Sequence, residues 1–175
     1  EDDSRKMSGL SADTPIDIRP EALRSEPSLI APAAAAAGIS SDTISIPGVP
    51  DRLLGKALAS LDQHRGSLAQ TGRIGIVDYA APSSKPRFYI IDLTNRTAEV
   101  LRVTHGSGSD PNHDGYLDRF SDIEGSNATS RGAYRTAEVY SGKYGRAERL
   151  DGLDDSNRTA RERAIVIHNA WYAEP

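Results

Sequence analysis

The sequence predicts a mainly β domain, either a sandwich or an open barrel, with one N-terminal helix and a disordered tail before that helix. Three observations lead to this fold class. The first 50 residues hold six of the ten prolines and no aromatic residue. The next 15 residues carry apolar side chains at helical spacing, and the chain beyond Gly72 forms short runs rich in β-branched and aromatic residues. A length of 175 residues fits one domain with a tail.

The tail is assigned to residues 1–50 and the domain to residues 51–175. The tail carries eight acidic and four basic residues and contains a run of alanines at 33–37. Such a composition buries little apolar surface, so we expect disorder or a loose position over the domain. The chain starts at Glu1 without a basic segment followed by an apolar one. No signal peptide can therefore be assigned, and the alternative that one was already removed stays open; we expect a processed or excerpted product.

A helix is predicted over residues 51–65. Pro50 precedes it, and Asp51 is expected to accept hydrogen bonds from the free N–H groups of the first turn. Gly66 is the predicted stop. The apolar stripe consists of Leu53, Leu54, Ala57, Leu58 and Leu61. This pattern indicates a helix that packs on the domain and carries no chemistry.

The first predicted strands form a hairpin. Residues 73–79 and 87–93 are rich in β-branched and aromatic side chains, and residues 98–103 return after a turn. Alternation predicts that Phe88, Ile90 and Val100 share one face.

Two further strands are predicted over residues 132–140 and 164–168. Loops rich in Gly, Ser, Asp and Asn connect them, and no internal repeat is evident. The sum is a β-rich domain with a single helix.

Composition excludes several classes of function. The net charge is −4 without a basic run, which argues against nucleic acid or an anionic membrane as the main partner. Apolar runs such as 33–37 and 164–167 are too short to span a bilayer. The 175 residues contain no cysteine, so they hold no disulfide, thiolate metal site or thiol nucleophile. The oligomeric state stays open.

Among the four histidines, His168 has the position that best suits chemistry. It ends the apolar run 164–167, where a strand would leave the core for an open edge. A neutral imidazole there can act as a general base, and the alternative is a core histidine satisfied by hydrogen bonds. His64, at the polar end of the helix, is expected to be solvated.

The segment 110–115 has oxygen-bearing side chains at alternate positions and a glycine at the sixth. Asp110, Asn112 and Asp114 match the opening half of a calcium loop, and His113 lies among them. The twelfth position is Ser121, where a bidentate Glu is required. A surface loop rich in turns is therefore favoured, and a calcium-stabilised interaction domain remains a weaker alternative.

The Gly-Ser-Gly-Ser segment at 106–109 is too short for a phosphate loop and lacks the Gly-Lys-Ser/Thr ending. Ser107 and Ser109 lack the context of a nucleophile elbow, which makes a serine hydrolase a weak proposal. His105, beside this segment, either faces a cleft or is structural.

A series of motifs in continuous order resembles the murein L,D-transpeptidase catalytic-domain family. The motifs are His-Gly-Ser-Gly-Ser at 105–109, Arg-Phe-Ser-Asp at 119–122, Gly-Ser at 125–126, Ser-Arg-Gly-Ala-Tyr at 130–134, Tyr-Ser-Gly-Lys-Tyr-Gly at 140–145, Arg-Leu-Asp-Gly-Leu at 149–153 and Ala-Arg-Glu-Arg-Ala-Ile-Val-Ile-His at 160–168. The resemblance covers residues 51–172, and the order of the motifs carries it more than any single one.

The resemblance implies a β-rich cysteine acyl-transferase that acts on peptidoglycan stem peptides in the periplasm or outside the cell. In the family, a cysteine attacks an L,D peptide bond and expels the terminal D-residue, and the thioester passes to a second stem or to water. His168 matches the family's base, which favours the catalytic interpretation, and the backbone carbonyl of Asn169 orients its ring. His105 and Tyr134 are predicted to bind substrate. No cofactor or metal is implied.

The chain departs from the family at the nucleophile. The family's cysteine lies in a Ser/Arg-x-Gly-Cys stretch well beyond the histidine, whereas seven residues follow His168 and none is cysteine. We expect the cysteine to be encoded beyond Pro175 and the chain as given to be inactive. The alternative is a cysteine-less module that binds peptidoglycan or another envelope polymer without cleaving it.

Overall fold

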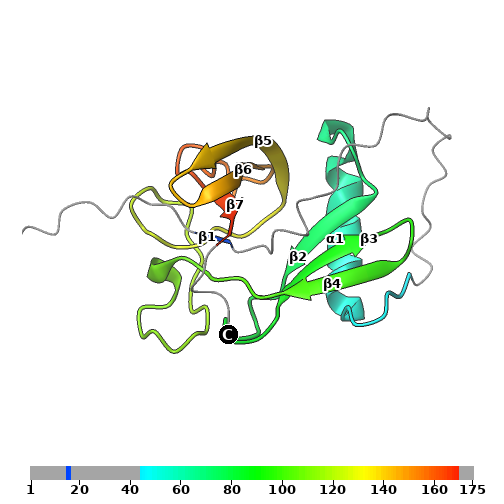
Figure 1. The fold of residues 1–175 in the computed structure, drawn as a ribbon, viewed down its shortest axis with the longest axis horizontal. Coiled ribbons are helices and arrows are strands. Elements are labelled where there is room, and N and C mark those ends of the chain that lie inside the picture. The colour runs from blue at the N-terminus through cyan, green and yellow to red at the C-terminus, as the bar shows by residue number, and fades with distance from the viewer. Residues whose placement is uncertain (1–14, 17–43, 170–175) are drawn as a thin grey trace, which may run out of the picture.

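The computed structural model describes residues 15–16 and 44–169. Most of the expected tail, 1–14 and 17–43, and the last six residues lie outside the described part. The described chain forms two sheets and one long helix, and its strand pairs are antiparallel except for one short parallel pair (Figure 1). The prediction of a mainly β fold with a single helix near its start is confirmed.

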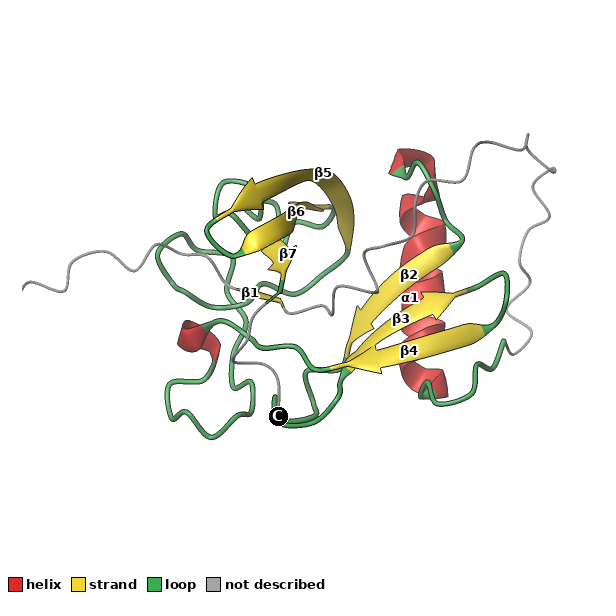
Figure 2. Ribbon diagram, in the orientation of Figure 1, coloured by secondary structure: helices red, strands yellow, loops and turns green. Residues whose placement is uncertain are grey.

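The first sheet is the predicted hairpin together with the strand before it. Its strands are β2 (Arg73–Val77), β3 (Phe88–Asp92) and β4 (Thr97–Leu101), paired antiparallel in chain order. Helix α1 (Asp51–His64) crosses one face of this sheet (Figure 2). The core between helix and sheet contains Ile46, Val49, Leu54 and Ile91. Ile46 and Val49, which the sequence analysis assigns to the tail, are therefore buried against α1 and the sheet.

Both ends of α1 differ from the predicted cap at Asp51 and the predicted stop at Gly66. The helix begins at Asp51, but no side chain caps it. The carbonyl of Pro50 accepts hydrogen bonds from the N–H groups of Leu53 and Leu54 instead. At the other end α1 passes into the 3₁₀ turn η2 (Arg65–Ser67), so that Gly66 lies within this turn.

The second sheet contains two strands that the sequence analysis did not predict, and one of them lies in the expected tail. Its order is β1 (Pro15–Ile16), β7 (Val166–His168), β6 (Gly145–Gly152) and β5 (Tyr134–Gly142), with β1 parallel to β7. Strand β6 was not predicted because charged residues separate its two fully buried side chains, Ala147 and Leu150, and glycines flank it. It follows β5 directly through the two-residue turn Lys143–Tyr144.

A second core joins buried side chains from both sheets and from the loops beside them. Its first members come from the first sheet and the residues that follow it: Phe88, Leu101 and Val103. They pack against buried side chains from the second half of the domain: Leu150, Ala160, Ile165 and Ile167.

The predicted face of the hairpin was wrong at one position. Val100 pairs with Tyr89, whereas Phe88 pairs with Leu101. Opposite residues in an antiparallel pair share a face, so Val100 lies on the other side of the sheet from Phe88. It is 37% exposed.

Candidate active site

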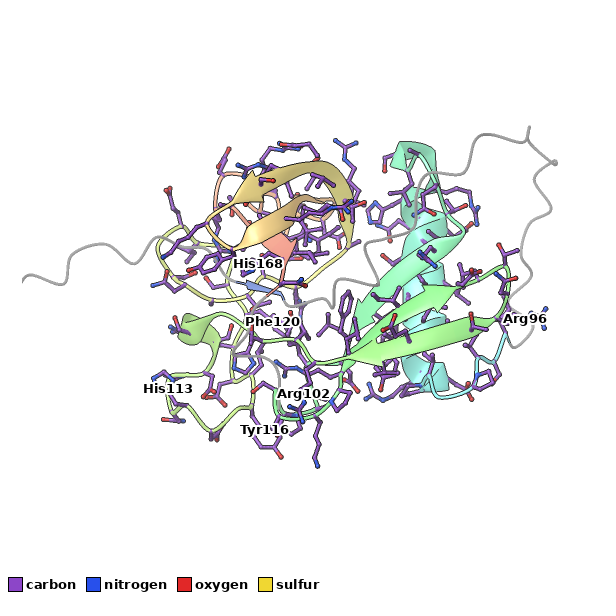
Figure 3. All side chains as sticks on the ribbon, viewed as in Figure 1. Arg96, Arg102, His113, Tyr116, Phe120 and His168 are labelled. Atoms are coloured by element: carbon purple, nitrogen blue, oxygen red, sulfur yellow. The ribbon has the colours of Figure 1, made fainter. Side chains whose placement is uncertain are left out.

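Strand β7, an inner strand of the second sheet, places His168 at its C-terminal end. Val166, Ile167 and His168 are all buried, and β6 pairs along them with Ala147 opposite His168. The β-branched residues Val166 and Ile167 favour this extended backbone. Strand β7 lies between β1 and β6, so the strand that holds the histidine is paired on both sides. Figure 3 labels His168 on this strand.

A hydrogen bond to the next residue fixes the ring of His168. Its Nδ1 lies 2.7 Å from the carbonyl oxygen of Asn169. A carbonyl can only accept, so Nδ1 carries the proton and the neutral ring keeps a lone pair on Nε2. Among the residues that the structure describes, buried Nε2 has no hydrogen-bond partner. In this tautomer Nε2 can accept a hydrogen bond or a proton, and the predicted role of His168 as a base stays a prediction.

The turn between β5 and β6 covers this imidazole. The ring of Tyr144 is stacked on His168, with centroids 4.7 Å apart and planes 11° from parallel. A cavity of about 100 Å³ lies beside the pair. It is lined by Tyr140, Gly142, Lys143, Tyr144, Ala147, Val166 and His168. Sequence reasoning missed Tyr144, because an aromatic residue in a tight turn carries no signal of the strand it will cover.

His105 lies in a different cluster, and both of its ring nitrogens are engaged. Arg87 donates from Nη2 to Nδ1 over 2.9 Å, and Nε2 donates to the Oδ2 of Asp110 over 3.3 Å. Burial, followed by the charge of Arg87, holds the pKa of His105 below its usual value. The predicted contact of His105 with substrate stays a prediction, and these bonds give the ring a structural task.

Asp110 binds the loop that resembled a calcium site. Its Oδ1 accepts from the N–H of Asp114, and its Oδ2 accepts from Gly115 and His105. Burial alone would raise the pKa of Asp110, but the hydrogen bonds from Gly115, Asp114 and His105 lower it. Within residues 15–16 and 44–169, no group of three or more His, Asp or Glu side chains could hold a metal ion.

Tyr134 starts β5, and its hydroxyl turns back to the preceding loop. The hydroxyl donates to the carbonyl of Ser130 over 2.8 Å, and the Oγ of Ser130 lies 2.9 Å away. Burial raises the pKa of the Tyr134 hydroxyl. Its predicted role in substrate binding also stays a prediction. The structure brings neither Tyr134 nor His105 into the cavity beside His168.

The comparison with known families decides the membership of the chain. A sequence model of the L,D-transpeptidase catalytic domain matches residues 46–175. The chain belongs to the L,D-transpeptidase catalytic-domain family. The predicted resemblance is thereby confirmed. No curated protein and no solved structure matches the chain significantly.

The family match includes Ile46 and Val49, consistent with their burial against α1. No helix in the described part of this L,D-transpeptidase domain is long and apolar enough to cross a membrane. His64 differs from the prediction of a solvated side chain, since its Nε2 lies 3.0 Å from the Oδ1 of Asp154 and the side chain is 14% exposed.

Arg163 is a second residue that sequence reasoning missed in the L,D-transpeptidase domain. It is 3% exposed and reaches the loop before β5. Nη1 donates to the carbonyl of Ser121 over 2.9 Å, and Nη2 donates to the carbonyl of Ala128. An Arg between a Glu and an Ala gives no sequence signal of burial, because charged residues at such positions are usually solvated.

Proposed function

We propose that the chain provides the base of a peptidoglycan L,D-transpeptidase that acts on stem peptides through a cysteine thiol. The observation that supports it is the bond from the Nδ1 of His168 to the carbonyl of Asn169, which in the neutral ring puts the lone pair on Nε2, an atom without a partner among the described residues. A thiol needs an adjacent base to become a thiolate, and the base needs a third group to hold its orientation.

The proposed reaction uses His168 as base and then as acid in each of its two halves, formation and resolution of the thioester. Nε2 first takes the proton of the thiol, and the sulfur then attacks the carbonyl of an L,D peptide bond. The protonated imidazole next gives its proton to the departing amine, so that the terminal D-residue leaves and a thioester remains. An amine of a second stem, or water, then attacks the thioester while giving a proton to Nε2. The C–S bond breaks, and the departing sulfur takes that proton back from the imidazolium. The buried surroundings of His168, which is 1% exposed, limit competition from solvent.

The 175 residues contain no cysteine, so the nucleophile of this scheme is not among them. We propose that these residues alone do not carry out transpeptidation. We also propose that the protein acts in the cell envelope, in the periplasm or outside the cell, because its family acts on peptidoglycan.

A carbapenem tests the proposal in a protein that also includes the coding sequence after residue 175. We expect one covalent adduct by mass spectrometry, formed on a cysteine. His168→Ala should slow acylation by about 10²- to 10⁴-fold, the usual contribution of a positioned base. The matched control is His113→Asn, because His113 is exposed and its φ of 55° suits Asn. Acylation of His168→Ala at the parent rate would overturn the role of this residue.

A second candidate function is binding without cleavage. The observation that favours it is the lack of cysteine in the 175 residues. It predicts that the chain is retained on isolated sacculi at physiological salt and releases no D-alanine. A chain that washes off under these conditions contradicts this candidate.

A further inference from the structure

A buried histidine that the proposed reaction does not use connects the first sheet to the long loop after β4. The side chains of His105 and Asp110 are each 7% exposed. Arg87, the residue before β3, donates from Nη2 to the Nδ1 of His105 over 2.9 Å, and the Nε2 of this ring lies 3.3 Å from the Oδ2 of Asp110. A guanidinium can only donate, so Nδ1 is the acceptor and Nε2 carries the proton. The neutral ring in this tautomer therefore satisfies both partners, and the protonated ring cannot.

The guanidinium of Arg87 is held in place from several sides. Its Nε donates to the carbonyl of Val103 over 3.0 Å, and its Nη1 donates to the carbonyl of Ala81 over 2.7 Å. Its Cζ also lies 5.1 Å from the centre of the Tyr79 ring, and the whole residue is fully buried. An arginine stays protonated at any pH that the fold meets. A fixed positive charge therefore faces the Nδ1 of His105, and it has no room to withdraw.

Asp110 connects the histidine to the backbone of the loop. Its Oδ1 accepts from the N–H of Asp114 over 3.1 Å, and its Oδ2 accepts from the N–H of Gly115 over 2.9 Å. The carbonyl of Gly115 accepts in turn from the N–H of Ser83 over 2.8 Å, in the loop between β2 and β3. The carboxylate of Asp110 thus holds the turn of this loop, and His105 is a side chain that positions the carboxylate.

A proton on Nδ1 of His105 places two donors and two positive charges against each other. The bond from Arg87 is lost, whereas the attraction to Asp110 grows. We propose that His105 is a pH-sensitive latch: on acidification the ring turns from Arg87 toward Asp110, and the loop 110–115 opens while both sheets stay folded. This inference is independent of the proposed function, because neither a thiol nor a substrate takes part in it.

The charged groups around His105 set the range in which the latch works. Burial and then Arg87, at the start of β3, hold the pKa of His105 below its usual value of about 6.5, against the opposite influence of Asp110 and Asp114 from the loop. Burial alone would raise the pKa of Asp110, but its hydrogen bonds lower it, so this partner keeps its charge. The closed loop is therefore favoured at neutral pH, and the preference is lost in mild acid.

Amide hydrogen exchange of the 175-residue chain, followed by NMR with a chelator present, tests the latch. The rates are compared at about pH 7.5 and about pH 5, on either side of the usual pKa of histidine, and are corrected for the intrinsic dependence of exchange on pH. The protection of the Asp114 and Gly115 amides should fall by about tenfold in acid, as expected for one lost charge-assisted contact. The amides of β3 should keep their protection.

Two variants separate His105 from other groups that titrate. In His105→Gln the carboxamide oxygen can accept from Arg87 and the NH₂ group can donate to Asp110, but the side chain does not titrate. Its loop should keep the same protection at both pH values. The matched control is His113→Asn, in the same loop, because His113 is exposed and its φ of 55° suits Asn. This variant should respond to acid as the parent does.

The parent chain carries the test if His105→Gln does not fold. The chemical shifts of the Asp114 and Gly115 amides should then change with the same midpoint as the ring resonances of His105. Three results overturn the latch: a parent loop whose protection is the same at both pH values, an equal loss in the parent and in His105→Gln, or a midpoint of the loop that follows another histidine. A simultaneous loss of protection in β3 also overturns it, because the acid then unfolds the sheet and not the loop alone.

Discussion

Replacing Arg163 by Ala should strongly destabilise the domain. The guanidinium is 3% exposed and donates to two carbonyls of the loop before β5, those of Ser121 and Ala128. A hydrogen bond from a charged group contributes about 1.5–3 kcal/mol, and a buried acceptor left without a donor costs a similar amount. We therefore expect a loss of about 3–6 kcal/mol in the free energy of unfolding. This is a large part of the ~5–15 kcal/mol that a domain usually has.

Urea unfolding, followed by tryptophan fluorescence or circular dichroism, measures this loss by linear extrapolation. Arg163→Lys keeps the charge but cannot reach both carbonyls in a fork, so about half the loss is expected; it carries the test if the Ala variant does not fold. Arg158→Ala is the matched control. Arg158 is exposed on the same connection, and its loss should change stability by less than about 0.5 kcal/mol. A loss below about 1 kcal/mol for Arg163→Ala would refute the reasoning that this residue holds the loop.

Two further predictions concern the loop that begins at His105. Gly108→Ala should lower the melting temperature by several degrees, because the added methyl group would collide with the carbonyl oxygen of Ser126. The control is Gly66→Ala, whose added methyl group has open space, so this variant should be as stable as the parent or more stable. Calorimetry measures the melting temperature of both variants. Burial and then Arg87 hold the pKa of His105 below its usual value of about 6.5, so the unfolded chain binds a proton that the folded ring refuses. The stability from this difference is present above about pH 6.5 and is lost as the pH falls below it. His105→Asn should flatten the decline in unfolding free energy between about pH 7 and 5, and an unchanged slope would contradict the assignment.

Local patterns in the sequence predicted the first half of the domain well. The stripe of α1 and the strands β2, β3 and β4 each bury one face against a neighbour close in the chain, so periodicity alone reveals them. Strand β7 was predictable for the same reason, since its apolar run is buried on every side.

The missed features depend on partners that are distant in the chain. Strand β6 has a polar sequence and becomes a strand because β5 and β7 pair on its two sides. Arg163 is buried because carbonyls 35 and 42 residues earlier accept its hydrogen bonds. A pattern search along the chain sees neither relation, because the compensation for burying a charge is absent from the local sequence.

The candidate site depends both on local sequence patterns and on pairing between segments that are distant in the chain. The position of His168 and the carbonyl that orients it are local, so sequence and family resemblance could indicate them together. The stack with Tyr144 depends on the register of β6, which places Ala147 opposite His168 and Gly142 opposite Gly145. A shift of one residue in this pairing would move the turn away and direct alternate side chains to the other face. The register of β6, a strand without an obvious sequence signal, therefore determines whether the ring of Tyr144 stacks on His168.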